Sequence, residues 1–243
     1  MLEHIHVERV LFIDIETVTQ HPDYSLLKPE IKTLWDYKAG FIDKVQEPGE
    51  VYQNKGAIYA EFGKIICISI GYLKKENEAY IAKLKSFFHK EEHELLSAFS
   101  DFILDLQSKK TSYIFGGHNI REFDIPYICR RMLLNGISLP EMLNIVGKKP
   151  WEVDIIDTLQ FWKFGDYKNF TSLKLLCQIF DIKEVKEGMN GGDVGTEYWE
   201  HHNITKIVNY CETDVLAVMK LLMKFKQIKE LKIEKIEYGI GDS

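Results

Sequence analysis

Runs of β-branched and large apolar residues alternate along the chain with stretches whose apolar positions recur every three or four residues. The runs end at polar residues or glycine, which is typical of strands, and they predict five strands, at residues 9–15, 64–73, 78–84, 112–115 and 153–156. The helical spacing predicts helices at residues 91–106, 125–134, 171–180 and 204–225. This order of elements indicates an α/β fold with a mixed five-stranded sheet flanked by helices.

Two segments do not follow this pattern. Residues 17–62 form a long insertion after the first strand, rich in aromatic residues and without a clear strand. Residues 183–196 are rich in glycine, but they do not follow a strand as a phosphate-binding loop would, so we expect a surface loop before a short helix. With 243 residues, the chain is expected to form a single domain over residues 1–243, with a peripheral tail at residues 230–243.

The composition is that of an ordinary globular protein. Hydrophobic residues make up 45% and charged residues 28%, which excludes a disordered chain and a small disulfide scaffold. The apolar runs are too short to cross a bilayer and the first residues are charged, so we expect a cytoplasmic protein with no membrane association. The cysteines are scattered without a C-x-x-C pair, which favours reduced thiols over a zinc site.

The charge balance is acidic. Lysine and arginine together number 31 against 37 aspartates and glutamates, which gives a formal net charge of −6. The chain therefore does not have the basic footprint of a protein that binds nucleic acid non-specifically. An enzyme whose site holds its own cations is compatible with this balance, because those cations offset charge that would otherwise repel a polyanion.

Two carboxylates stand near the end of the first predicted strand. Side chains alternate along a strand, so Asp14 and Glu16 share a face with Val10 and Phe12, and they stand about 7 Å apart on it. Two such carboxylates can share a divalent metal ion. A strand that simply ends in solvated acids is the alternative interpretation.

Asp214 lies in the apolar stripe of the helix predicted at residues 204–225. A buried carboxylate there needs a cation, a strong donor or a proton, whereas an aspartate at the edge of the stripe is simply solvated. Tyr210 precedes it by one helical turn, so both side chains can reach the same point. Asp124 stands just before another predicted helix with proline in its first turn, and helix N-capping alone explains it.

Together these residues form the order D-I-E-T at 14–17, N-x-x-x-F-D at 119–124 and Y-x-x-x-D at 210–214. With this order the chain resembles the DEDD superfamily of 3′→5′ exonucleases. The tyrosine matches the DEDDy branch, which includes the proofreading domains of family A and family B DNA polymerases and ribonuclease D. The chain is most similar to the stand-alone bacterial exonucleases related to the family B polymerase exonuclease domain.

The resemblance implies a ribonuclease-H-like (DnaQ-like exonuclease) fold and a site for two Mg²⁺ or Mn²⁺ ions, which prefer hard oxygen ligands. It assigns Asp14 to both ions and Asp124 to the second ion. It assigns Glu16 and Asp214 to the ion that activates water, and Tyr210 to orienting that water.

The same resemblance places the terminal nucleotide near four residues of the first two motifs, namely Thr17, Asn119, Arg121 and Phe123. Arg121 is a candidate phosphate ligand, and a solvated arginine at a helix edge is its alternative. His118 is expected to be structural.

Other aromatic and basic residues have two interpretations. Trp35, Tyr37 and Phe41 of the insertion can stack on unpaired bases or pack the insertion onto the core, and packing is favoured. A small cluster of Lys148, Lys149 and Trp151 has the same two interpretations.

We therefore expect a metal-dependent 3′→5′ exonuclease that releases 5′-mononucleotides from single-stranded DNA. Its expected partners are single-stranded 3′ ends and a polymerase or repair factor in trans. An RNA-processing exoribonuclease like ribonuclease D shares the same catalytic residues, but that family usually has an additional C-terminal helical domain. A catalytically idle nucleic-acid-binding module is the third interpretation, and the intact acids and tyrosine argue against it.

Overall fold

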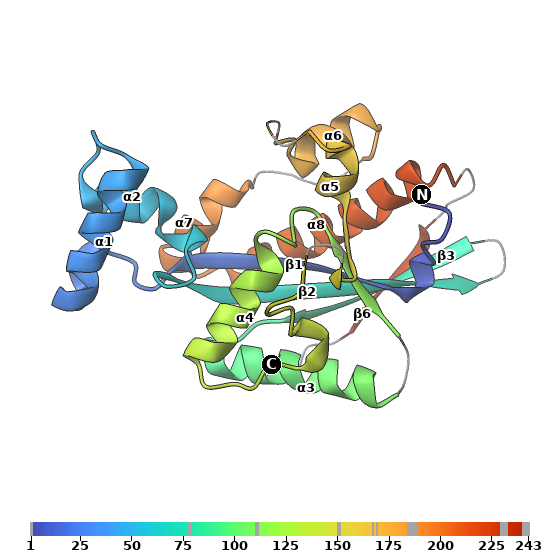
Figure 1. Cartoon of the computed structure of the whole chain (residues 1–243), viewed down its shortest axis with the longest axis horizontal. Helices are drawn as coiled ribbons and strands as arrows, with labels where there is room; N and C mark the ends of the chain where they lie inside the picture. Colours follow the sequence, from blue (N-terminus) through green and yellow to red (C-terminus); the bar gives the residue numbers. More distant parts are fainter. Residues whose placement is uncertain are drawn as a thin grey trace.

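The computed structural model describes residues 2–76, 79–109, 112–149, 152–166, 168, 170–183, 189–228 and 233–239. Its strands are β1 (Val10–Thr19), β2 (Gly63–Glu76), β3 (Ala79–Phe87), β4 (Ile114–Gly117), β5 (Ile155–Asp157) and β6 (Ile233–Gly239). They form one mixed six-stranded sheet in the order β5-β4-β1-β2-β3-β6 (Figure 1). The first three strands are antiparallel neighbours, β4 and β5 run parallel to β1, and β6 runs parallel to β3.

All five predicted strands are present, which confirms the mixed α/β sheet. β1 continues to Thr19, beyond the predicted end at residue 15, with a shift of its register against β2 between Glu16 and Thr17. β6 comes from the predicted tail and pairs with the edge strand β3. It escapes prediction because its apolar residues do not alternate with polar ones as they do in a half-buried strand. Glu78, the first residue of the third predicted strand, lies outside the described residues.

Eight α-helices surround the sheet in the described parts of the chain. They are α1 (Pro29–Ile42), α2 (Pro48–Lys55), α3 (Glu92–Ser108), α4 (Asp124–Leu134), α5 (Thr158–Lys163), α6 (Leu173–Ile179), α7 (Val194–Trp199) and α8 (Ile204–Phe225). Within these same parts, none of the helices combines the length and apolar character that a membrane span requires. The four predicted helices correspond to α3, α4, α6 and α8.

The two faces of β1 pack against different helices. Leu11, Ile13 and Ile15 share a core cluster with residues of α3 and α4. Val10 and Phe12 point the other way and pack with apolar residues of α8. Figure 1 shows the same arrangement, with α3 and α4 on one side of the sheet and α8 on the other. The alternation predicted for the first strand therefore holds, and it turns Asp14 and Glu16 toward α8.

The insertion folds into the helices α1 and α2 at the end of the sheet where β1 finishes (Figure 1). Trp35 is the centre of its core, with the rings of Tyr52 and Phe62 at centroid distances of 5.3 and 4.8 Å. The indole of Trp35 also donates a hydrogen bond to the carbonyl oxygen of Pro48. Tyr37 and Phe41 lie on the outer face of α1 and are exposed. Packing is thus the role of Trp35, and the other two aromatic side chains are left at the surface.

The glycine-rich segment is a surface turn in its described part. Gly191–Asp193 forms one 3₁₀ turn that leads directly into α7, and Asn190 and Asp193 close a reciprocal capping box there. This arrangement agrees with the predicted surface loop before a short helix. Residues 184–188 lie outside the described residues, and so does Trp151 of the predicted basic and aromatic cluster.

Candidate active site

The first side of the site is the end of β1 that faces α8. A carboxylate oxygen of Asp14, one of Glu16 and the Sγ atom of Cys211 all lie within 4.8 Å of one another. The Cys211 thiol donates to Asp14 Oδ2 at 3.3 Å and contacts the Asp14 carbonyl oxygen at 3.4 Å. The two β1 carboxylates therefore meet α8 directly, and they do not end in bulk solvent.

α8 supplies the second side. Asn203 caps its N-terminus by accepting a hydrogen bond from the Lys206 backbone N–H, and the apolar stripe of the helix faces the sheet. Asp214 is buried within that stripe. Its charge acts on both Asp14 and Tyr210, because it contributes to raising the pKa of each. The structure thus brings Tyr210 and Asp214 to the β1 carboxylates.

Asp124 supplies the third side, from the first residue of α4. Phe123 is the N-cap residue, so the N-capping role predicted for Asp124 is wrong. Its Oδ1 instead accepts the backbone N–H of Ile15 at 3.1 Å. The reason lies in the sheet: β4 pairs with β1 only from Val10 to Phe12, so the N–H of Ile15 lies beyond the paired stretch. A buried N–H must find an acceptor, and Asp124 provides it.

Negative charge accumulates where these three sides meet. Burial and then the charges of Asp214, Asp124 and Glu16 raise the pKa of Asp14 well above its ordinary value. Burial, with smaller contributions from Asp157 and Asp214, raises the pKa of Asp124 to about 7. Binding of protons or of cations lowers the electrostatic repulsion between carboxylates in such a place.

Tyr210 and Cys211 remain protonated in this field. Burial is the main cause that raises the pKa of the Tyr210 hydroxyl, followed by the charge of Asp214 and then those of the β1 carboxylates. Burial also raises the pKa of the Cys211 thiol, together with its hydrogen bond to Cys67. The ligands available to a metal ion are therefore carboxylate oxygens, and this donor set suits Mg²⁺ or Mn²⁺ better than a thiophilic ion.

The predicted nucleotide-contacting residues lie beside these carboxylates in the chain. Thr17 follows Glu16, and its hydroxyl donates to the Ala57 carbonyl oxygen at 3.0 Å. Asn119 has a left-handed backbone (φ 65°), and its Oδ1 is buried without a hydrogen-bond partner among the described residues. Phe123 packs against the core, 5.4 Å from the ring of Tyr127. Arg121 is half-buried, and its guanidinium contacts the Val153 carbonyl oxygen at 3.5 Å.

The sequence analysis missed Asp157, a buried carboxylate behind this turn. It is the last residue of β5 and only 1% exposed, and it accepts the backbone N–H groups of Asn119, Arg121, Leu159 and Gln160. Its signal in the sequence is an acid between a short apolar run and a helix, D-T-L-Q, which is an N-cap pattern. Asp157 thus caps α5 and holds the turn before Asp124 at the same time.

Two further residues complete the surroundings. His118 bridges the Thr158 hydroxyl and the Thr171 carbonyl oxygen, each at 2.9 Å, which agrees with the structural role predicted for it. The sequence analysis also missed the contact of the Cys211 thiol with Asp14. The signal was its position directly after Tyr210 in the third motif.

Comparisons with known proteins bear on this site. A family model described as a predicted 3′–5′ exonuclease related to the exonuclease domain of PolB matches residues 58–239, so it includes Asp124, Tyr210 and Asp214 and begins after β1. No curated protein matches the chain. Among solved structures, the chain is similar to the family B DNA polymerase from the hyperthermophilic archaeon Pyrobaculum calidifontis, with a TM-score of 0.57 and 13% sequence identity.

That similarity covers 89% of this chain and 24% of the polymerase, so the chain spans about a quarter of the polymerase's length. At this level of identity the likeness shows the fold, and it confirms the predicted α/β architecture of a mixed sheet flanked by helices. The family model covers well over half of the chain. The chain therefore belongs to the family of predicted 3′–5′ exonucleases related to the exonuclease domain of PolB.

Proposed function

We propose that this chain is a metal-dependent 3′→5′ exonuclease that releases 5′-mononucleotides from single-stranded DNA. The observation that carries the proposal is the convergence of Asp14, Glu16, Asp124 and Asp214 at one point, with Tyr210 beside them. The family supports the reaction, and the single sheet supports one exonuclease domain over residues 1–243.

The carboxylates are the proposed ligands of two Mg²⁺ or Mn²⁺ ions. Asp14 lies close to Glu16 and is affected by the charges of Asp214 and Asp124, which supports Asp14 as the ligand shared by both ions. Glu16 and Asp214 would complete one ion, and Asp124 the other. When bound, such a pair supplies charge neutralisation at phosphorus and a water of lowered pKa.

Tyr210 is the proposed positioning group for the attacking water. Its raised pKa keeps the phenol protonated at neutral pH, so it can donate a hydrogen bond while its own oxygen accepts another. Its ring belongs to the same helix as Asp214 and lies one turn earlier, which fixes the hydroxyl relative to that carboxylate. The hydroxyl is hydrogen-bonded to the Asp214 side chain, and a water that donates to its oxygen would face the phosphodiester with a lone pair.

The turn between β4 and α4 is the proposed site of the terminal nucleotide. The buried Oδ1 of Asn119 supports this role, since the left-handed backbone there is held by Asp157 and the oxygen remains available to a donor on the substrate. Phe123 would stack on the terminal base, Thr17 would offer its backbone amide to the 3′-OH, and Arg121 would approach a phosphate.

The test is single-turnover release of mononucleotides from end-labelled single-stranded DNA, with Mg²⁺ or Mn²⁺ and excess enzyme. Tyr210→Phe removes one positioned hydrogen bond and should slow cleavage by about 10²–10³-fold, whereas Asp214→Asn should slow it further. Tyr113→Phe, at a half-buried tyrosine outside the site, is the matched control and should cleave as wild type.

Two outcomes would refute this proposal. Full activity of Tyr210→Phe would remove the tyrosine from the mechanism. Products that arise internally or from the 5′ end would exclude a 3′→5′ exonuclease. The same assay with RNA of identical sequence tests the substrate: we expect faster cleavage of DNA, and the reverse order would favour the RNA-processing alternative.

A further inference from the structure

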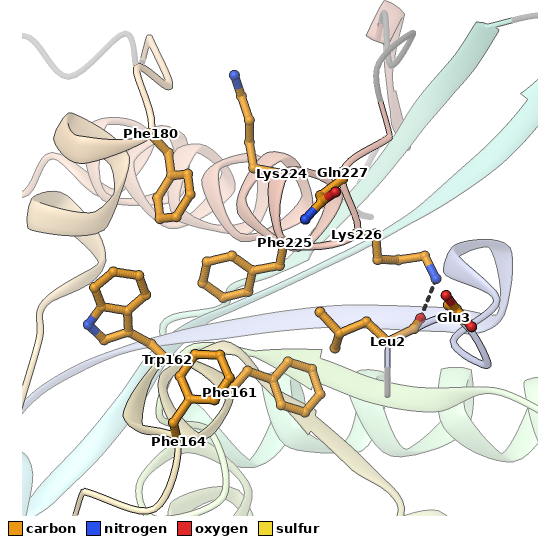
Figure 2. Close-up of a pocket in the computed structure, with 10 residues that line it drawn as sticks. All are labelled: Leu2, Glu3, Phe161, Trp162, Phe164, Phe180, Lys224, Phe225, Lys226 and Gln227. Atoms are coloured by element: carbon orange, nitrogen blue, oxygen red, sulfur yellow. Dashed lines mark hydrogen bonds between the residues drawn. The ribbon is translucent and has the colours of Figure 1, made fainter.

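An aromatic hollow lies at the far end of α8 from the acidic site. It has a volume of about 610 Å³, and five aromatic side chains line it: Phe161, Trp162, Phe164, Phe180 and Phe225. Figure 2 shows the rings of Trp162, Phe180 and Phe225 turned toward a common space between α5, α6 and α8. We call this feature the aromatic hollow.

The rings form walls that a further flat ring can contact. Trp162 and Phe225 are nearly parallel, with an interplanar angle of 12° and a centroid distance of 6.3 Å. Phe180 meets both of them edge-on, at 5.8 and 5.4 Å. Phe164, at the rim, is 86% exposed. Aromatic side chains that line an open hollow are typical of a ligand-binding site.

The rim of the hollow is cationic, although the chain as a whole is acidic. Lys224 and Lys226 at the end of α8 line it, and Glu3 is the one acid among the described residues that do so. The Lys226 ammonium is fixed by the carbonyl oxygens of Leu2 and Ile5, and Lys224 is exposed to solvent (Figure 2). Aromatic walls beside lysines suit an unpaired base with its flanking phosphates. A purely apolar peptide would leave the lysines without counter-charge.

The position of the hollow relates it to the acidic site. Asp214 and Phe225 are eleven residues apart on α8, which is about three turns and about 16 Å, so they lie on the same face of the helix. Between them α6 covers Ala217 and Leu221. A strand that reaches from the acids to the hollow must pass around α6. At about 3.4 Å per nucleotide, a stacked strand covers the straight distance of about 16 Å in about five nucleotides, and the path around α6 adds to that number.

From these observations we infer that the aromatic hollow binds an unpaired base of the single-stranded substrate, five or more nucleotides from its 3′ end. The flanking phosphates lie at Lys224 and Lys226. This inference rests on the proposed function and adds to it a second contact with the substrate, remote from the cleaved bond. It makes the affinity for substrate depend on length, because only longer strands reach both places.

Binding in EDTA, which prevents cleavage, tests the inference with fluorescently labelled dT oligomers of four and twelve nucleotides. Phe164→Ala should weaken binding of the 12-mer by about 5- to 150-fold, the effect of losing one base stack, and leave the 4-mer unchanged. Lys224→Glu should weaken the 12-mer and lower the salt dependence of its binding. Leu104→Ala on α3, at a leucine that is 50% exposed, and Lys90→Glu are the controls and should bind as wild type.

A second readout does not depend on affinity. Saturating 12-mer should quench the tryptophan fluorescence, and Trp162→Phe, which keeps an aromatic wall, should abolish that quenching. A second 12-mer carries abasic sites beyond the fifth nucleotide from its 3′ end. The wild-type protein should bind this oligomer as weakly as the Phe164→Ala variant binds the intact 12-mer.

Several results would overturn the inference. Equal effects of Phe164→Ala and Leu104→Ala, equal affinity for both lengths, or unchanged fluorescence with bound 12-mer would each exclude a base in the hollow and leave it as a surface for a protein partner. These results leave the proposed function intact, provided that the wild type still cleaves 4-mers from the 3′ end. Absence of any cleavage would instead refute the proposed function itself.

Discussion

Replacement of Asp124 by asparagine isolates the electrostatic cost of the acidic site from its structural bonds. Asn keeps the size of the side chain and an Oδ1 that can still accept the Ile15 N–H, which Asp124 now accepts at 3.1 Å. It removes one negative charge from a buried position that is only 4% exposed. The variant should therefore fold in the same way and be more stable without divalent cations.

The sign and size of the effect follow from proton linkage. Burial raises the pKa of Asp124 to about 7 from its ordinary 3.8, so the folded state binds a proton that the unfolded state has released between these two values. The contribution of this proton to the free energy of unfolding is fully present below pH 3.8 and is lost as the pH rises toward 7. Each pH unit in that window costs about 1.4 kcal/mol, which gives a ceiling of about 4 kcal/mol at pH 8. For a chain of this size, 1 kcal/mol corresponds to about 2–4 °C in Tm.

Thermal melts in EDTA from pH 4 to pH 8 measure the difference directly. The Tm of Asp124→Asn should exceed that of wild type by several degrees at pH 8, and the gap should close as the pH falls to 4. Asp124→Ala is the control, because it also removes the charge but leaves the buried Ile15 N–H without its acceptor, at a cost of about 1–3 kcal/mol. It should be less stable than Asp124→Asn at every pH. A gap that does not change with pH, or an Asn variant less stable than wild type at pH 8, would show that the clustered charges impose no such cost.

Two further predictions concern the same region. Millimolar Mg²⁺ or Mn²⁺ should raise the wild-type Tm at pH 8, since the ions bind only the folded state, and Asp14→Ala should lose most of that increase; an unchanged wild-type melt would contradict the two-ion proposal. Asp157→Ala deprives four backbone N–H groups of their acceptor and should lower the free energy of unfolding by about 3 kcal/mol or more, with Asp157→Asn in between, as denaturant unfolding would reveal. Equal stability of the Ala variant and wild type would mean that water replaces the carboxylate at this turn.

The parts of the site that periodicity controls were predictable from the sequence. Alternation along β1 places Asp14 and Glu16 on the face of Phe12, and that face packs on α8. The 3.6-residue period of α8 likewise places Asp214 with the buried stripe. In both cases one strand or helix determines which way a side chain points, so local sequence suffices.

The parts that depend on where a neighbouring strand ends were not predictable. Asp124 looks like an N-cap in the sequence, but the end of the β1–β4 pairing leaves the Ile15 N–H for it to accept. Asp157 looks like an ordinary cap, yet it also holds Asn119 and Arg121 from another turn. Both contacts join residues more than thirty positions apart. No local pattern encodes them.

The insertion was unpredictable for a different reason. α1 and α2 each begin at a proline, and their apolar residues gather on one face less clearly than those of α3, α4 and α8. What stabilises them is the packing of Trp35 between Tyr52 and Phe62, which joins the two helices to the start of β2. Tertiary contacts of this kind override local helix propensity.

The structural and chemical uses of the buried carboxylates are linked by the sheet itself. β4 and β5 run parallel to β1, so their carboxyl ends lie together, and the backbone N–H groups beyond those ends need acceptors. Asp124 and Asp157 meet that need for Ile15 and for the β4–α4 turn. Burial raises the pKa of Asp124, and the charge of Asp157 adds to that effect. A carboxylate that the fold requires as a hydrogen-bond acceptor therefore already lies at this point, and its charged form is destabilised there. A divalent cation would bind most favourably at such a place. The proposed ions would therefore stabilise the fold most at the same point where the proposed phosphodiester hydrolysis requires them.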